Sequence, residues 1–346
     1  MREQKLINAE LCHDILVSKI VPRFSYKNDV DYAEWKTKVQ EKFYELTGLD
    51  EIPNNECPLN IQIEWEEDRG TYTILRFTFD SEVGETVPCY LLTPNTGKEK
   101  YPVAIVLQGH STGFHLSIGE YKEGDEAYRE KGNGKFAIQA VENGFIALAI
   151  EQRGLGERKP LKGNRLPKNN CQYASRIALE IGRTILGERI WDVHKAIDAL
   201  SAFPKCDMDK ILITGNSGGG TASYYAACYD ERIKLSVPSC SFSPYKESIL
   251  SIAHCACNYI PSAFKYFDMQ DLACMIAPRK LVVVTGQKDT IFPIDGVRRG
   301  FETVKAIYER NNAGENCRII ETPMDHWWCE DIVWPAIKEE TEKLGW

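Results

Sequence analysis

The sequence predicts an α/β fold, in which helices flank a mostly parallel central sheet and an antiparallel hairpin and a helical N-terminal extension come first. Three observations support this prediction. The first 50 residues carry helical periodicity, and two strand-like segments around a turn follow them. From residue 102 onward, short apolar runs alternate with helix-like stretches. Such alternation is typical of a sheet joined by right-handed crossovers.

The N-terminal helical extension is assigned to residues 1–55. Trp35, Val39 and Phe43 recur every four residues and would share one helix face, and Gly48 lies where a C-terminal cap is expected. An antiparallel hairpin is then predicted, because residues 72–79 and 86–92 are strand-like and flank a turn at Gly84.

Residues 56–346 are predicted to form one α/β domain. Its apolar runs resemble parallel strands covered on both faces, and each lies next to a helix-like stretch or an insertion. The expected strands are 103–107, 145–150, 210–214, 233–237 and 281–285, and the expected helices are 136–143, 184–200 and 221–229. Insertions at about 111–133 and 241–275 break the alternation and are candidates for a lid or a pocket wall.

Composition narrows the class of protein. The 346 residues are 43% apolar and 27% charged, which is typical of a globular chain. A net charge of −8 argues against nucleic-acid or anionic-membrane partners. The sequence has no signal-peptide pattern and no apolar run of about 20 residues, so we expect a cytoplasmic protein without a membrane span. Homo-oligomerisation is compatible with these features.

The twelve cysteines are expected to be reduced and mostly buried as small apolar residues. One tight cluster, His254-Cys255-Ala256-Cys257, has ligand chemistry, but a second pair at zinc-site spacing is missing. Packing is the favoured interpretation, and no metal site is predicted.

The strongest chemical signal is Gly215-Asn216-Ser217-Gly218-Gly219, between an expected strand and an expected helix. Glycines on both sides relieve the clashes of a sharp turn that lifts a serine above the sheet. The following helix directs its N-terminal N–H groups at the site. Because phosphate-loop and dinucleotide motifs are not matched here, Ser217 is predicted to be a nucleophile.

A nucleophilic serine needs a base, and the base needs an acid to orient it. His326 is the histidine that lies well downstream in a C-terminal loop, with His254 as its competitor. Asp289 follows an apolar strand, where such sheets build their sites, and a turn or N-cap residue is the less favoured interpretation of it. Asp325 is adjacent to His326 and is poorly placed to reach its ring. We therefore predict Ser217, Asp289 and His326 as a triad.

An oxyanion hole is expected from the backbone N–H groups of Gly218 and His110, although His110 could instead act only through its ring. Trp327 is a candidate substrate contact. Several aromatic residues and one histidine in the loops could rim the pocket or could equally be packing residues. This set comprises Phe114, His115, Tyr121, Phe242, Tyr245, Tyr259, Tyr266, Trp327 and Trp328.

Over roughly residues 60–335 the chain resembles the α/β-hydrolase superfamily, most closely its acetylxylan-esterase and dienelactone-hydrolase-like branch of bacterial serine esterases. Besides the serine motif, the resemblance rests on residues 151–157, 187–192 and 276–279. It implies a serine carboxylesterase that needs no cofactor and hydrolyses short-chain acyl esters, acetyl esters first, of small molecules such as carbohydrates. The chain departs from these relatives by having Gln108 in the oxyanion loop and Gly218 after the serine.

Other functions remain open from the sequence. A peptidase or amidase, an acyltransferase and a thioesterase can share the fold and the triad. A catalytically inactive binding protein of hydrolase fold is a more distant alternative, because the triad and its glycines are complete.

Overall fold

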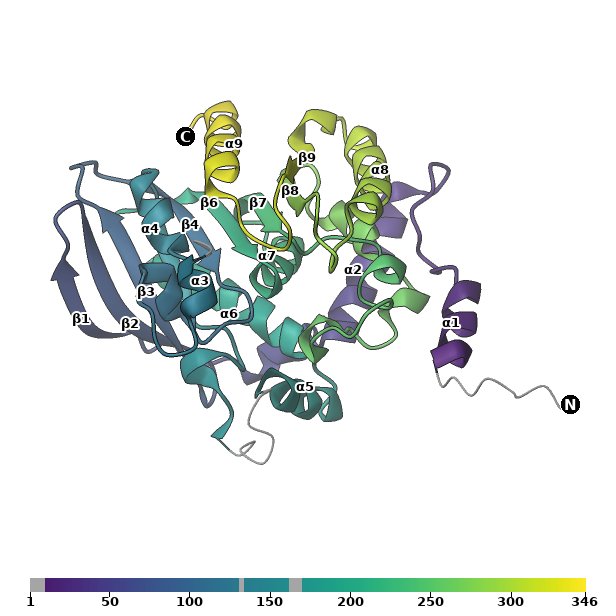
Figure 1. Cartoon of the computed structure of the whole chain (residues 1–346), viewed down its shortest axis with the longest axis horizontal. Helices are drawn as coiled ribbons and strands as arrows, with labels where there is room; N and C mark the ends of the chain where they lie inside the picture. The colour runs from purple at the N-terminus through teal and green to yellow at the C-terminus, as the bar shows by residue number, and fades with distance from the viewer. Residues whose placement is uncertain (1–9, 131–133, 162–169) are drawn as a thin grey trace, which may run out of the picture.

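In the computed structural model, which describes residues 10–130, 134–161 and 170–346, nine strands form one sheet in the order β1-β2-β3-β5-β4-β6-β7-β8-β9 (Figure 1). Strands β1 to β3 are antiparallel, β3 pairs antiparallel with β5, and the remaining pairs are parallel. This confirms the predicted fold class. The strands are β1 (Gln62–Asp68), β2 (Tyr72–Glu82), β3 (Glu85–Pro94), β4 (Tyr101–Leu107), β5 (Ile146–Ile150), β6 (Cys206–Asn216), β7 (Ile233–Ser239), β8 (Lys280–Gly286) and β9 (Cys317–Thr322).

Helices cover both faces of this sheet. Helices α2, α6, α7 and α8 contribute to one apolar cluster, and α4 and α9 contribute to the other. None of the helices in the described part of the chain combines the length and the apolar composition that a membrane crossing needs. The helices are α1 (Glu10–Lys19), α2 (Tyr32–Thr47), α3 (Glu126–Glu130), α4 (Phe136–Glu142), α5 (Asn170–Glu180), α6 (Ile185–Leu200), α7 (Gly218–Tyr229), α8 (Ile294–Arg310) and α9 (Glu330–Lys343).

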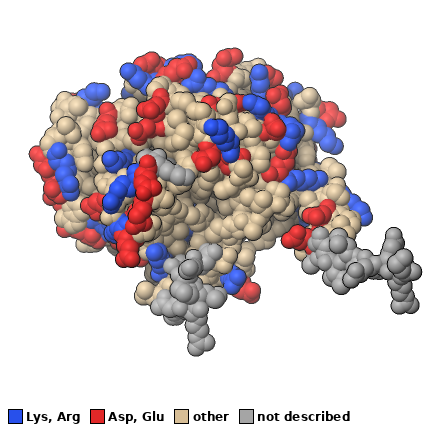
Figure 2. Space-filling view, viewed as in Figure 1, with Lys and Arg blue, Asp and Glu red and all other residues tan. Residues whose placement is uncertain are grey.

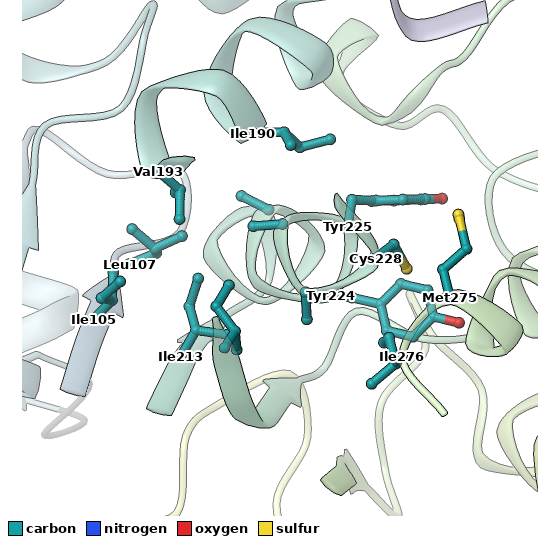
Figure 3. Packing of buried hydrophobic residues seen from close by; sticks show 14 of the residues in the cluster. Ile105, Leu107, Ile190, Val193, Ile213, Tyr224, Tyr225, Cys228, Met275 and Ile276 are labelled. Carbon is teal, nitrogen blue, oxygen red and sulfur yellow. The ribbon is translucent and has the colours of Figure 1, made fainter. Parts of the chain in front are cut away.

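Strand β4 shows why continuous apolar runs form the centre of the sheet. Ile105 and Leu107 face the cluster that contains α6 and α7, while Val106 faces the opposite cluster. Alternate residues of a strand point to opposite faces, so a strand covered on both sides is apolar throughout. Figure 3 shows Ile105, Leu107 and Ile213 directed towards helix α7, with Ile190 and Val193 of α6 nearby.

The hairpin of β2 and β3 closes at Gly84, which has a φ of 84°. Strand β1 extends the hairpin by a third antiparallel strand. All seven of its residues are exposed, so its sequence lacks the apolar pattern of a buried strand. Its several carboxylates suit an edge strand, where charge discourages pairing with another chain.

Helix α2 ends as its sequence predicts. Gly48 adopts the left-handed conformation with a φ of 79° and caps the helix through its N–H. Phe43 stacks on Tyr225 of α7 with ring centroids 5.7 Å apart, and it contacts the edge of Phe267 at 6.3 Å. The N-terminal segment thus shares the core of the sheet region.

The two expected insertions differ in structure. Residues 111–130 contain a short 3₁₀ helix, η2 (Phe114–Ile118), and helix α3. Residues 131–133 of that insertion lie outside the described residues. Segment 241–275 is a succession of 3₁₀ turns, and Phe242, Phe267 and Leu272 in it are buried in the main core.

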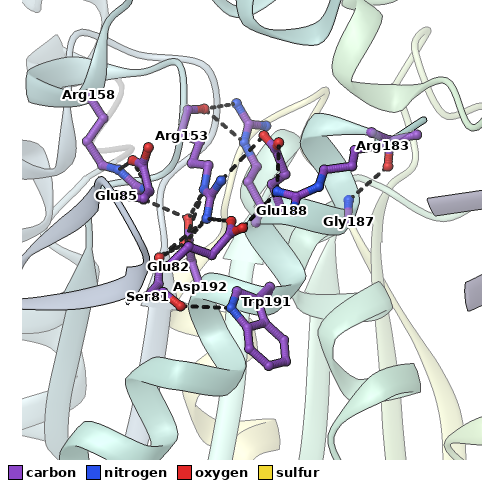
Figure 4. Close-up of polar contacts among 12 residues, drawn as sticks. Ser81, Glu82, Glu85, Arg153, Arg158, Arg183, Gly187, Glu188, Trp191 and Asp192 are labelled. Atoms are coloured by element: carbon purple, nitrogen blue, oxygen red, sulfur yellow. Dashed lines mark hydrogen bonds and ion pairs between the residues drawn. The ribbon is translucent and has the colours of Figure 1, made fainter. Parts of the chain in front are cut away.

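A buried ionic cluster joins the hairpin to helix α6 (Figure 4). Arg153 donates to both carboxylate oxygens of Asp192 and to Glu82, and Arg158 donates to Asp192 at 2.7 Å. Ser81 also donates to Asp192 at 2.7 Å. Burial alone would raise the pKa of Asp192, but Arg153 and Arg158 outweigh it and lower that pKa to about 2.

Candidate active site

Ser217 occupies the sharp turn between β6 and α7, with a φ of 55° and a ψ of −122°. A non-glycine residue with positive φ is strained, and such strain persists only where surrounding structure imposes it. A Cβ on Gly215 would lie 2.4 Å from the carbonyl oxygen of Leu107, and a Cβ on Gly219 would lie 2.0 Å from the same oxygen. Glycine is therefore required on both sides of the turn by the close passage of β4.

The structure brings the predicted triad residues together. The Oγ of Ser217 lies 2.8 Å from Nε2 of His326, and Nδ1 of His326 lies 2.8 Å from Oδ2 of Asp289. A carboxylate accepts only, so Nδ1 carries the proton and Nε2 is left to accept the hydroxyl proton of Ser217. This tautomer is the one that a general base needs.

Asp289 is also the turn residue that its sequence context allows. Its Oδ1 accepts hydrogen bonds from the backbone N–H groups of Ile291, at 2.8 Å, and Phe292, at 3.1 Å. With one oxygen engaged by the turn, the other is directed at His326. The ring of Phe292 stacks on His326 with centroids 6.0 Å apart. Asp289 therefore makes the contacts of a turn residue with one oxygen and contacts His326 with the other, and its role as the acid of a triad stays a prediction.

The histidine loop crosses directly over the end of β8. A Cβ on Gly286 would lie 1.9 Å from the carbonyl oxygen of Asp325, so this crossing requires glycine. Asn216 holds the loop from the other side, because its Nδ2 donates to the carbonyl oxygen of His326 at 3.2 Å. Ser239 donates to the Oδ1 of Asn216 at 2.8 Å. This role of Asn216 was not predicted, because the only feature of the sequence that indicates it is the position of Asn216 directly before Ser217.

The loop after β4 passes beside Ser217. A Cβ on Gly109 would lie 3.3 Å from the Cβ of Ser217. The backbone nitrogen of His110 lies 3.8 Å from where a Cβ of Gly218 would be, and its N–H has no hydrogen-bond partner within the described residues. The N–H of Gly218 is the first of helix α7 and lacks a carbonyl one turn earlier in the helix. Within the part of the chain that the structure describes, two backbone N–H groups without a partner therefore lie beside the serine.

A buried carboxylate fixes this loop from behind. Gln108 donates to Oε1 of Glu151 at 2.7 Å, and the backbone N–H groups of Phe114 and Glu157 donate to Oε2 at 3.2 Å. Gln152 in turn donates to the carbonyl oxygen of Gln108 at 2.5 Å. Burial raises the pKa of Glu151 to about 7, and the two backbone donors only partly offset that rise.

A cavity of about 270 Å³ opens onto Ser217 and His326. Its walls include Leu116, Phe136 and Trp327. Trp327 therefore lines the cavity beside Ser217, and its contact with a substrate stays a prediction. Segment 241–275 contributes no residue to this lining.

Most of the other candidate rim residues pack elsewhere. Phe114 stacks on Tyr90 at 4.5 Å, Trp328 belongs to the core beneath α4 and α9, and Tyr245 is buried beside Tyr225. His115 is buried and pairs with Asp125, with 2.9 Å between Nε2 and Oδ2. Packing is the role of these residues.

His254, the competing histidine, is engaged away from Ser217. Its Nε2 lies 3.0 Å from the Oγ of Ser248, and its ring contacts the edge of Phe292 at 5.4 Å. Burial lowers the pKa of His254, and the neighbouring His326 lowers it further. Cys240 lies near Asp289, and burial raises the pKa of its thiol to about 12, so it is a thiol rather than a thiolate at neutral pH.

The cysteine cluster has other members than the consecutive residues His254–Cys257 suggest. Cys255 and Cys257 lie near His110 and Cys171, and the four ligand atoms are all within 4.8 Å of one another. His254 is not a member of this group. Cys171 and His110 were missed as partners because they come from distant parts of the chain.

Comparison with known proteins supports the fold assignment. A Bacillus subtilis (strain 168) protein named "Putative hydrolase YtaP" is 25% identical over 290 residues, covering 83% of this chain and 92% of that protein. A structure titled "putative acetyl xylan esterase" from Bacteroides fragilis NCTC 9343 matches with a TM-score of 0.76 and 16% identity, covering 98% of this chain and 96% of that one.

A glucuronoyl esterase from Solibacter usitatus matches with a TM-score of 0.64 and 16% identity, covering 93% of this chain and 98% of that one. At such identities these structures establish a common fold. The model of the Abhydrolase family matches residues 2–327, which is most of the chain. The resemblance to α/β-hydrolases is thereby confirmed, and the chain belongs to the Abhydrolase family.

Proposed function

We propose that this protein is a serine esterase that hydrolyses short-chain acyl esters, acetyl esters first, and that carbohydrate acetates are its substrate class. The single observation that carries the proposal is the chain of contacts from Asp289 through His326 to Ser217, with 2.8 Å at each step. The two free N–H groups of His110 and Gly218 beside the serine supply the other half of the machinery for acyl transfer.

The reaction follows from these positions. His326 Nε2 takes the proton of Ser217 as Oγ attacks the acyl carbon, and Asp289 stabilises the imidazolium that forms. The former carbonyl oxygen accepts hydrogen bonds from the His110 and Gly218 N–H groups. The ester C–O bond then breaks, and the leaving alcohol takes the proton from His326. Water repeats the sequence on the acyl-enzyme, releasing the acid and restoring Ser217.

Cavity size and lining support a small neutral acyl group. The cavity of about 270 Å³ is below the roughly 300–1,000 Å³ typical of pockets for drug-sized ligands. Its lining within the described residues is largely apolar and includes neither Lys nor Arg, which suits a neutral acyl group. Trp327 offers an aromatic face of the kind that packs against a sugar ring.

The structural neighbours point to the same substrate class, since they include proteins titled acetyl xylan esterase and glucuronoyl esterase. Charged side chains of both signs are interspersed over the visible face of the molecule (Figure 2), which suits a small-molecule substrate better than a polyanionic partner.

The test is a substrate panel assayed with the purified protein. It contains acetylated xylo-oligosaccharides, methyl esters of glucuronic acid, p-nitrophenyl esters of increasing acyl length and short peptide amides. We expect kcat/KM to be highest for acetyl esters, to fall as the acyl chain outgrows the cavity, and to be undetectable for amides. Preferred cleavage of peptides would contradict the proposal, and equal rates for long and short acyl chains would contradict the assigned acyl site.

A further inference from the structure

Four ligand side chains from three separate segments converge beside the candidate active site. His110 comes from the loop after β4, Cys171 from the first turn of α5, and Cys255 and Cys257 from 3₁₀ helix η6 (Ala256–Asn258) and the residue before it. Their ligand atoms lie within 4.8 Å of one another, and Nε2 of His110 is 3.1 Å from the Sγ of Cys257.

The donor set matches one class of ion. Three thiolates and one imidazole are a typical ligand set of structural zinc, which is bound tetrahedrally. With Zn–S bonds of about 2.3 Å and Zn–N bonds of about 2.0 Å, neighbouring donors of such a tetrahedron lie roughly 3.5–3.8 Å apart. The spread of the four atoms, from 3.1 Å for one pair to at most 4.8 Å, brackets this spacing.

We propose that His110, Cys171, Cys255 and Cys257 bind a divalent metal ion, Zn²⁺ by ligand type, in a closed structural site. On binding, each of the three thiols forms a metal–sulfur bond and releases its proton to solvent. No oxidant or reductant is needed, because the ion remains divalent. The site lies outside the hydrolytic machinery proposed above, although His110 belongs to both through different atoms.

A buried arginine supplies an independent observation. Arg189 is 3% exposed, and it donates to the carbonyl oxygen of Arg153 at 2.7 Å and to the Sγ of Cys171 at 3.3 Å. Within the described residues, Arg189 makes no hydrogen bond to a carboxylate. A buried guanidinium needs a counter-charge. Three thiolates with Zn²⁺ carry one negative charge, which Arg189 neutralises, whereas three neutral thiols leave its charge unbalanced.

The position of the site indicates what the ion does. Four protein ligands leave no open coordination position, as in structural rather than catalytic zinc sites. The apolar packing at this junction is small and comprises Leu155, Cys171, Ile185 and Cys257. The ring of His110 also lies against Gly218, where a Cβ would approach its Nδ1 to 3.0 Å. The ion would therefore fasten α5 and η6 to the loop that carries an oxyanion donor.

The direct test is the metal content of the full-length protein purified under reducing conditions without chelator, measured by inductively coupled plasma mass spectrometry. We expect about one zinc ion per chain, retained through gel filtration. Reconstitution of the chelated protein with Co²⁺ should produce thiolate-to-metal charge-transfer absorption and the visible bands of tetrahedral Co²⁺. The Cys255→Ser and Cys171→Ser variants should lose the metal and these bands.

Cys329→Ser is the matched control, because Cys329 is partly exposed like Cys255 but lies outside the cluster. It should retain the metal in full. Thiol titration after denaturation separates the alternatives. Twelve free thiols together with bound zinc support the site. Two fewer thiols and no metal would identify a disulfide, and twelve thiols with neither zinc nor a Co²⁺ spectrum would identify packing. Either of these last results overturns the proposal, and both are independent of esterase activity.

Discussion

The side-chain amide of Asn216 donates a hydrogen bond of 3.2 Å to the backbone carbonyl of His326, and so connects the residue before the proposed nucleophile to the loop of the proposed base. Ser239 fixes the same amide through its Oδ1 at 2.8 Å. The position of His326, the proposed proton acceptor, thus depends on Asn216, which is not itself a member of the proposed triad.

Replacing Asn216 by Ala should slow the reaction without removing any reacting group. The His326 loop would lose its tie to the turn, and misplacement of a catalytic group by about 1 Å can cost on the order of 100-fold in rate. We expect kcat for p-nitrophenyl acetate to fall roughly 10–100-fold with little change in KM. Ser239→Ala, which removes only the far bond, should have a smaller effect. An unchanged kcat in Asn216→Ala would contradict this positioning role.

Asp289→Asn tests the assigned tautomer of His326. The turn N–H groups of Ile291 and Phe292 require an acceptor, so the Asn oxygen should face them and its NH₂ should face Nδ1. That orientation favours a proton on Nε2, which then cannot accept from Ser217. We expect kcat to fall by about 10⁴-fold with the fold preserved. Asp325→Asn is the neighbouring control and should stay close to wild type, and equal losses in the two variants would contradict the assignment.

Glu151→Gln should change how stability depends on pH. The pKa of Glu151 is raised by burial from 4.5 to about 7, so its favourable contribution is complete below 4.5 and is lost as pH rises through about 7. Gln cannot ionise, and Gln108, whose Oε1 has no partner within the described residues, can rotate its amide to accept from it.

Urea unfolding of both proteins between pH 5 and pH 8 measures this effect. We expect the free energy of unfolding of the wild type to decline relative to Glu151→Gln as pH rises, by up to about 3 kcal/mol. Parallel pH profiles for the two proteins would show that Glu151 does not titrate as its burial indicates.

Asp192→Asn should be strongly destabilising. The variant leaves the guanidinium groups of Arg153 and Arg158 buried without their shared carboxylate. Removing one partner of a buried ionic cluster costs about 3–5 kcal/mol. In the wild type the pKa of Asp192 is lowered from 3.8 to about 2, so its contribution is present above 3.8 and is lost as pH falls towards 2.

The control for Asp192→Asn is a variant that breaks an exposed ion pair. Glu67→Gln removes the partner of Arg69 on the surface of β1, where such pairs contribute only about 0–1 kcal/mol. Denaturant unfolding at pH 7 should separate the two variants clearly. Similar small losses would mean that the cluster around Asp192 contributes little to stability.

The candidate site was predictable from the sequence where local pattern determines position. Ser217 and Asp289 each follow an apolar strand, and the carboxyl ends of parallel strands meet at one edge of the sheet. His326 was identified by its place after them in the chain. Strand β9, which precedes it, was missed because only two of its six residues, Ile319 and Ile320, are large and apolar.

Contacts made only by tertiary folding could not be read in advance. Cys171 and His110 are far apart in the chain, and a spacing rule for zinc ligands finds only local pairs such as Cys255 and Cys257. The hydrogen bond from Asn216 to the His326 carbonyl could not be predicted either, because no sequence motif indicates which group the amide beside Ser217 contacts.

Labelling with a fluorophosphonate, followed by intact-mass measurement and peptide mapping, tests the central claim most directly, because such probes react with a serine that an adjacent base has activated. We predict a single adduct located on Ser217, absent in Ser217→Ala and strongly reduced in His326→Ala, with hydrolysis of p-nitrophenyl acetate lost in step with labelling. A wild-type protein that hydrolyses the ester but carries no adduct on Ser217 would contradict the account.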